Sequence, residues 1–393
     1  MTASGTTSPA ESEGSSAKHY RTGTHRTVSP ASTLARLKPY LRDMGITRLA
    51  NVTGLDRVGI PVVMAMRPNS RSVAVSQGKG VDLEAAKASA LMESVETWHA
   101  ERITLPTLYG SVADLSGAAA LADMEIFPET RSFRFDPTRR LLWIEADDLM
   151  TGEAHWIPYE MVHTDYTVPT PPGHGCFPCS TNGLASGNQV VEAQCHAICE
   201  VIERDATTLL HHMPRQERYA RRVDLSTVDD AECRAILSKL ADAGLEMVVW
   251  ETTTDIGIAS FYGLLLPAEG AVEHIGAGAG THPSRAIALS RTLTEAIQTR
   301  LTYISGARDD LLEEEFTLAG LEQKADAARQ MIGSGQAERS FLDAPTIEQD
   351  LLTDDLQMLL ERLAGCGISR VYALDLSQPH LPVSVVRIVI PEL

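Results

Sequence analysis

The sequence predicts an α+β fold in which long helices pack against a largely antiparallel sheet. Two observations favour this class. Apolar strand patterns occur as hairpins, joined by short turns such as MTGE, as often as they alternate with helices. Three long segments, in addition, carry the apolar spacing of helices that are buried on most sides. A doubly wound parallel sheet would alternate strands and helices regularly, so we consider it the less suitable class.

The pattern of apolar residues and turn residues places the individual elements. Pro30 opens the first predicted helix, which carries Leu34, Leu37 and Leu41 on one face. Helices are predicted over residues 30–44, 83–99, 190–212 and 284–305. Strands are predicted over residues 61–66, 73–75, 141–146, 155–158, 246–252, 258–266, 371–376 and 383–390.

Length and composition suggest one main folded unit. The 393 residues would allow two or three domains of ~150 residues or one large α/β unit. Residues 1–19 are rich in Ser, Thr, Gly, Pro and Ala and show no apolar period, so we expect a disordered tail there. Because no linker or repeat follows, residues 20–393 are expected to form a single domain.

Charge narrows the possible partners. The 52 acidic and 34 basic side chains give a net charge of −18, which argues against nucleic acid or an anionic membrane as the main partner. No apolar run reaches the ~18 residues of a membrane-spanning helix. Six cysteines are few for this length, so we expect a reducing cytoplasm.

Three predicted helices each present polar residues on one face. Within each helix these residues recur at spacings of three and four. They are Ser89, Glu93 and Glu96; Asn188, Glu192, His196, Glu200 and Glu203; and Arg291, Glu295 and Gln298. Each set alone is most simply a solvated face. The remaining positions, however, are mostly apolar and few lysines stand nearby, so buried carboxylates would need a hard cation such as Mg²⁺.

Small-residue segments precede the same three helices. They read SQGKG, STNGLASGN and GAGAGTHP, and we interpret them as loops whose glycines let phosphate oxygens approach a helix N-terminus. None is a Walker loop or a dinucleotide-binding turn. Together with the acidic faces they predict a site for magnesium and phosphate, without defining the reaction.

The motifs SQGKG…SALMESVE, STNGLASGN…EVIERDA and EAIQTR resemble, in this order, the three ATP-binding motifs of the YcaO family. The resemblance extends from about Tyr20 to the end and implies a YcaO-type, ATP-dependent catalytic domain. It implies that the magnesium ligands are Glu93, Glu96, Glu200, Glu203 and Glu295, with Glu192 a further acid at that site. It implies that the ATP contacts are Ser89, Asn188, Arg204, Arg291 and Gln298, with Arg26 and Lys79 near the phosphates. Thr97 stands where many members have arginine, so a secondary contact is expected to be missing.

The family resemblance also implies the chemistry. A nucleophile adds to a peptide backbone amide, whose oxygen then takes the γ-phosphoryl group of ATP. A Cys, Ser or Thr side chain yields an azoline, whereas external sulfide yields a thioamide. The end VVRIVIPEL lacks a proline-rich tail, and GTHRTVSP and ISGARDD are similar to members that work with a TfuA partner. We therefore favour thioamide formation on a ribosomally made precursor peptide, with a TfuA-like protein delivering sulfide to a homodimeric enzyme.

Other interpretations stay open. Cys176, Cys179, Cys195 and Cys199 have zinc-like spacing, but the last two share a helix with the proposed magnesium ligands. Cys176 or Cys179 in a sulfur relay, and His174 near substrate, are further alternatives. Two other functional classes also remain: an ATP-dependent ligase or small-molecule kinase, and a non-catalytic accessory protein that binds ATP.

Overall fold

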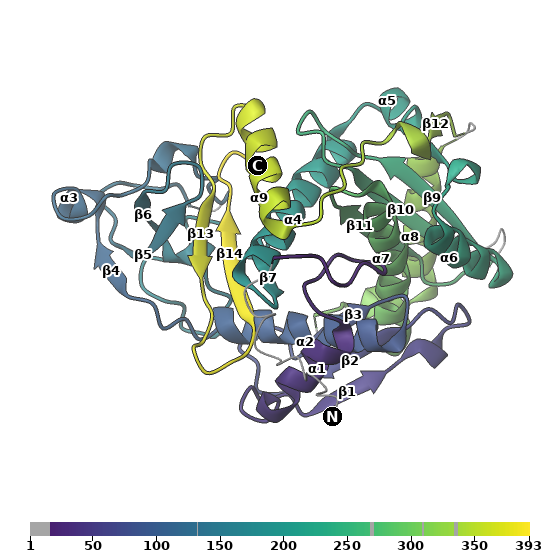
Figure 1. The fold of residues 1–393 in the computed structure, drawn as a ribbon, viewed down its shortest axis with the longest axis horizontal. Coiled ribbons are helices and arrows are strands. Elements are labelled where there is room, and N and C mark those ends of the chain that lie inside the picture. Colours follow the sequence, from purple (N-terminus) through teal and green to yellow (C-terminus); the bar gives the residue numbers. More distant parts are fainter. Residues whose placement is uncertain (1–15, 132, 268–270, 309, 334–336) are drawn as a thin grey trace, which may run out of the picture.

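The computed structural model describes residues 16–131, 133–267, 271–308, 310–333 and 337–393. Helices and strands alternate irregularly along the chain (Figure 1). The helices are α1 (Pro30–Leu37), α2 (Leu83–Ala100), α3 (Val112–Leu115), α4 (Val190–His212), α5 (Arg215–Tyr219), α6 (Ala231–Asp242), α7 (Arg285–Ser305), α8 (Leu318–Ile332) and α9 (Leu352–Gly365). The strands are β1 (Arg48–Asn51), β2 (Val62–Met66), β3 (Val75–Lys79), β4 (Thr107–Gly110), β5 (Leu141–Asp148), β6 (Ala154–Pro158), β7 (Leu184–Gly187), β8 (Val223–Asp224), β9 (Leu245–Glu251), β10 (Ser260–Pro267), β11 (Gly276–Thr281), β12 (Arg339–Ser340), β13 (Tyr372–Asp375) and β14 (Ser384–Val389).

Three antiparallel sheets surround the long helices. The largest has the order β4-β5-β13-β14-β7, with β6 paired to β5, and the other two have the orders β1-β2-β3 and β11-β10-β9. The short pair β8–β12 is parallel. Figure 1 shows α2, α4 and α7 in the region between these sheets. The predicted α+β class with largely antiparallel sheets is confirmed.

Each sheet contributes to a hydrophobic core against a neighbouring helix. One cluster joins α2 to the six-stranded sheet, with Val95 and Trp143 among its fully buried members. A second joins α6 and α7 to β9 and β10. A third lies between α4, α9 and the other face of the six-stranded sheet. The helices that carry the acidic faces are therefore fixed by apolar contacts on their remaining sides, as their composition predicts.

The predicted long helices agree closely with the structure. The helix predicted over 190–212 has those bounds, and those predicted over 83–99 and 284–305 differ by one residue at one end. Asp82 caps α2 by accepting a hydrogen bond from the Ala85 amide, and Gly306 ends α7 in the left-handed conformation with φ 57°. The first predicted helix is shorter, because α1 ends at Leu37 and continues as a 3₁₀ turn. Helices α6, α8 and α9 were not predicted.

The small-residue segments form strands, which corrects their interpretation as loops. SQGK lies in β3, LASG is β7 and GAGAGT is β11. A Cβ atom on Gly278 would lie 2.3 Å from the Thr292 carbonyl oxygen, and one on Gly78 would lie 2.0 Å from the Ala90 nitrogen. Such separations are far below any contact distance, so the glycines allow α7 and α2 to pack directly on the strand backbones.

Residues 1–15 of the predicted tail lie outside the described residues. From Ser16 onward the chain is instead held in place, in contrast to the prediction that the tail extends to residue 19. Ala17 forms a β-bridge with Leu351, and the buried Lys18 ammonium lies 2.6 Å from the Asp355 carboxylate. Because these partners are more than three hundred residues away in the sequence, local composition gave no indication of the contact.

Candidate active site

All thirteen residues assigned from the sequence to magnesium or ATP line one cavity of about 640 Å³. Helices α2, α4 and α7 supply most of them, and the segment before α1 supplies Arg26. The acidic members are Glu93, Glu96, Glu192, Glu200, Glu203 and Glu295. The other members are Arg26, Lys79, Ser89, Asn188, Arg204, Arg291 and Gln298. The structure therefore brings together the three polar faces that the sequence showed separately.

The carboxylates that α2 and α4 present to the cavity are largely surrounded by protein. Glu192 and Glu203 are buried, whereas Glu93, Glu96 and Glu200 are partly exposed. Burial raises the pKa of Glu93 to about 7, that of Glu96 to about 8 and that of Glu200 to about 7. Burial and the neighbouring Glu295 also raise the pKa of Glu203. Since the ionised forms are unfavourable in this environment, a cation placed among these oxygens would be held strongly.

Glu295 forms a close ion pair with a basic residue of the cavity. The Lys79 ammonium lies 2.6 Å from Glu295 Oε2. Burial opposes the ionisation of Glu295, but Lys79 outweighs it and lowers the pKa of this carboxyl. Lys79 comes from β3 and Glu295 from α7, so this ion pair joins two elements at the cavity.

The donor set fits a magnesium nucleotide. Carboxylate oxygens are the ligands that Mg²⁺ prefers, and guanidinium and ammonium groups bind phosphate. Two buried polar atoms at the cavity, Arg291 Nε and Gln298 Oε1, have no hydrogen-bond partner within the described part of the chain. Among those same residues no group of three His, Cys, Asp or Glu side chains is placed to hold an ion alone. Mg²⁺ is usually bound in proteins through one or two carboxylates together with substrate phosphates, and the cavity has carboxylates beside phosphate-binding groups.

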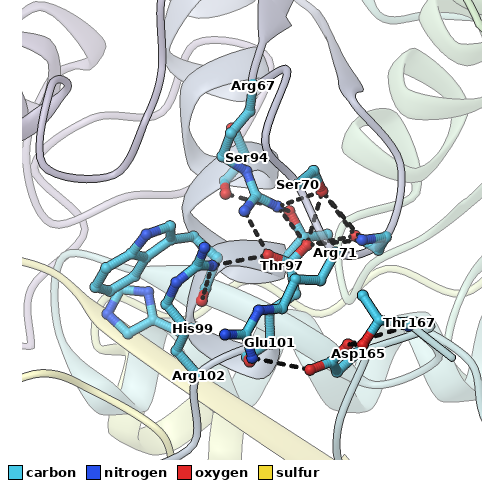
Figure 2. A network of polar contacts seen from close by, with 12 residues as sticks. Arg67, Ser70, Arg71, Ser94, Thr97, His99, Glu101, Arg102, Asp165 and Thr167 are labelled. Carbon is cyan, nitrogen blue, oxygen red and sulfur yellow. Dashed lines mark hydrogen bonds and ion pairs between the residues drawn. The ribbon is translucent and has the colours of Figure 1, made fainter. Parts of the chain in front are cut away.

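Thr97, where the sequence resemblance would lead one to expect an arginine, is contacted by an arginine from another segment. Arg67, which directly follows β2, donates from Nη2 to Thr97 Oγ1 at 2.9 Å (Figure 2). Its guanidinium also pairs with Glu101 at the end of α2. A guanidinium therefore does contact position 97, although it belongs to the residue after β2 and does not itself line the cavity.

Some cavity residues were not assigned from the sequence. Ser186 donates from its amide and its hydroxyl to Glu96 Oε1, at 2.8 and 2.6 Å. Arg308 lines the cavity and pairs with Asp310. Both lie in segments that the sequence singled out, ASGN and ISGARDD, but only contacts across the fold show what they face.

The cysteines and the loop histidine lie elsewhere. Cys176 is buried in the cluster beside α2, whereas Cys195 and Cys199 belong to the cluster between α4 and α9. Cys179 contacts the His163 carbonyl oxygen, and His174 contacts the His163 ring at 3.1 Å. These side chains do not line the cavity.

A family model described as YcaO cyclodehydratase, ATP- and Mg²⁺-binding, matches residues 77–393. The chain belongs to the YcaO family. It is 34% identical over 94% of its length to an uncharacterised protein in the tfuA 3′ region of Rhizobium leguminosarum bv. trifolii, covering 88% of that protein. It is also 34% identical over 93% of its length to an uncharacterised protein of Methanothermobacter thermautotrophicus, covering 94% of it.

Solved YcaO structures share the fold. YcaO from Methanopyrus kandleri, bound with AMPPCP and Mg²⁺, is 22% identical with a TM-score of 0.76, covering 96% of this chain and 94% of that one. A heterocyclase in complex with substrate and cofactor is 21% identical with a TM-score of 0.78. The match covers 96% of this chain but only 53% of the heterocyclase.

Family membership identifies the cofactors and the general reaction. ATP and Mg²⁺ are the cofactors, as the sequence motifs implied, and the reaction is ATP-dependent amide activation in the modification of ribosomally made peptides. No helix in the described part of the chain is long and apolar enough to span a membrane.

Proposed function

We propose that this chain converts a backbone amide of a ribosomally made precursor peptide into a thioamide, with a TfuA-like partner supplying sulfide. The observation that carries this choice is the relative in the tfuA 3′ region, which matches nearly the whole chain. The cavity supports the ATP-dependent step, because it combines clustered carboxylates with basic side chains.

In this proposal the residues have separate roles. Glu93, Glu96, Glu200, Glu203 and Glu295 hold Mg²⁺. Arg26, Lys79, Arg204 and Arg291 face the phosphates, while Ser89, Asn188 and Gln298 contact the rest of the nucleotide. ATP supplies the phosphoryl group that turns the amide oxygen into a leaving group. The protein contributes mainly by positioning the reactants and by neutralising charge.

The overall change balances. Hydrosulfide forms a new carbon–sulfur bond at the amide carbon, and the carbon–oxygen bond breaks after the oxygen has received the γ-phosphoryl group. The products are a thioamide, ADP and inorganic phosphate, and no oxidant or reductant is needed.

Mass spectrometry of the peptide tests the proposal. Peptide, ATP, Mg²⁺ and the enzyme without a sulfur source should give little product. Adding sulfide, or a TfuA-like partner that delivers it, should yield a peptide heavier by the difference between sulfur and oxygen. Loss of one water at a Cys, Ser or Thr without any sulfur source would instead show azoline formation.

A second measurement addresses the other functional classes. ATP hydrolysis that requires both peptide and a sulfur source supports the thioamide reaction. Turnover with an amine acceptor would indicate a ligase, and nucleotide binding without turnover under any of these conditions would indicate an accessory protein. The homodimer and the cytoplasmic location stay predictions, to be checked by light scattering and by fractionation.

A further inference from the structure

Glu192, near the start of α4, is the most completely hydrogen-bonded of the cavity carboxylates. Its Oε2 accepts from the amide and the hydroxyl of Thr27, both at 2.9 Å. Its Oε1 accepts from the amide and the side-chain nitrogen of Asn188, at 3.2 and 3.0 Å. Arg26 Nε lies 3.6 Å from the same oxygen. The Glu192 side chain is 1% exposed.

These contacts fill the hydrogen-bond acceptor capacity of the Glu192 carboxylate. Its two oxygens accept about four hydrogen bonds in total, and Glu192 already accepts four from protein. Glu96 and Glu203 differ, because protein donors reach only one oxygen of each among the described residues. A metal ion at Glu192 would have to displace the buried donors of Thr27 or the partly buried donors of Asn188, which is costly.

The donors on Oε2 belong to a segment that we call the N-terminal strap, residues 16–28. Figure 1 shows it in dark purple, crossing the middle of the molecule near α4 and α7. Thr22, Gly23, Thr24, Arg26 and Val28 of the strap line the cavity. The matched part of the family model begins only at residue 77, so the strap lies outside it.

The strap is anchored at both ends. Near its start Lys18 pairs with Asp355 of α9 inside the protein, and Arg21 pairs with the exposed Asp350. Near its end Thr27 is held by Glu192. Between these anchors the β-bridge from Tyr20 to Arg26 closes the turn that faces the cavity, and the buried His25 ring packs against His282. Glu192 therefore contacts both Thr27 and Arg26, beside the turn that faces the cavity.

We infer that Glu192 is a positioning residue that fastens the strap, and with it Arg26, over the nucleotide cavity, and that it is not a magnesium ligand. The inference rests on the proposed function only for the identity of the nucleotide. It replaces the expectation that Glu192 is one more acid of the magnesium site.

Two substitutions test the contact between Glu192 and Thr27, one at each partner. Glu192→Gln removes the charge that holds the strap. Thr27→Val removes one donor while leaving the Glu192 carboxylate intact, so it should have the same effect only if Glu192 acts through the strap. Asp350→Asn is the matched control, because it breaks an exposed strap contact of the kind that contributes little.

Three readouts on the full-length protein separate the possibilities. Isothermal titration calorimetry measures the affinity for AMPPCP with Mg²⁺ in excess. The Mg²⁺ dependence of AMPPCP binding is then measured at AMPPCP concentrations well above each variant's own Kd for AMPPCP. Glu200→Gln is the comparison. Trypsin cleavage after Arg26, measured without nucleotide, reports whether the strap is docked.

We expect both variants to bind AMPPCP about tenfold or more weakly, since each loses a hydrogen bond to a charged group. Trypsin should cut both variants after Arg26 faster than it cuts wild type. The double variant, Glu192→Gln with Thr27→Val, should bind AMPPCP only slightly more weakly than either single variant. The Mg²⁺ concentration at half-maximal AMPPCP binding should not change. The inference is overturned if Glu192→Gln shifts this Mg²⁺ concentration as Glu200→Gln does while Thr27→Val behaves as wild type. It is also overturned if Thr27→Val leaves both strap cleavage and AMPPCP affinity unchanged.

Failure of the proposed function looks different. A wild-type protein that binds AMPPCP but never modifies a peptide would contradict the thioamide proposal and leave the strap inference intact. Should Glu192→Gln fail to fold, Thr27→Val alone still decides the matter.

Discussion

The guanidinium of Arg67 and the carboxylate of Glu101 form a buried pair through two parallel contacts, Nη1 to Oε2 at 2.5 Å and Nη2 to Oε1 at 2.7 Å (Figure 2). Ser70 and Ser72 also donate to Glu101 Oε1 from their hydroxyls. The pair joins the end of β2 to the end of α2. It therefore fixes the helix that carries Glu93 and Glu96.

Glu101→Gln should destabilise the protein by about 3–5 kcal/mol at neutral pH, because it leaves the Arg67 guanidinium buried without its counter-charge. Urea denaturation followed by circular dichroism measures this loss. Asp326→Asn, at an exposed ion pair with Arg329, is the control and should change stability by about 1 kcal/mol or less. Equal stability of Glu101→Gln and wild type would show that the pair has no net stabilising effect.

Stability should also depend on pH through Glu101. Burial alone would raise the pKa of this carboxyl, but the hydrogen bonds from Arg67 and Ser72 lower it to about 2. A lowered folded-state pKa gives stability that is present above the unfolded value near 4.3 and is lost as the pH falls toward 2. Wild type should lose more stability than Glu101→Gln between about pH 5 and pH 2. Parallel curves for the two proteins would contradict this.

Glu93→Gln and Glu203→Gln should abolish ATP-dependent turnover while the fold survives. Each keeps the shape of the side chain but removes a charge that holds Mg²⁺ in the proposed function. Because burial disfavours the ionised form of both groups, the variants without ligand should melt at the same temperature as wild type or higher. Differential scanning fluorimetry should show stabilisation by Mg²⁺ and AMPPCP in wild type only. Near-normal turnover in both variants would mean that these carboxylates are structural.

Gly278→Ala should destabilise the protein by about 1–3 kcal/mol or more, since the new methyl would collide with the α7 backbone at Thr292. Displacement of α7 also moves Glu295, so AMPPCP affinity should fall as well. Gly365→Ala is the matched control: no atom lies within 4 Å of its added Cβ, and alanine favours the helix that it ends. Thermal denaturation compares the two, and equal melting temperatures would refute the close-packing argument.

The sequence predicted the long helices and their polar faces well, because both depend on local spacing. Glu93, Glu200 and Glu295 converge as expected, since each lies on a helix whose other sides are apolar. The glycine strands were misread, because Gly and Ser disfavour strands in isolation and only the helix packed above them makes a side chain impossible.

Contacts between distant residues could not be predicted in the same way. Lys18 stands in a polar segment, and its partner Asp355 lies on a helix that the pattern did not predict. The full engagement of Glu192 was likewise hidden, because Thr27 carries no signal of its own and lies 165 residues away. Spacing and the family motifs therefore named residues that line one cavity, whereas the contacts that each of them makes required the three-dimensional structure.

The backbone contact between β11 and α7 also limits which substitutions can shift the position of α7. A helix seated on side chains can be shifted by enlarging or trimming them, but α7 rests on a strand that has no side chain at Gly276, Gly278 or Gly280. No substitution there can move Glu295 by a small step, since even one methyl group is too large. Small changes in the shape of the cavity are therefore expected to arise from the loops and the strap around it, while the glycine strand stays constant.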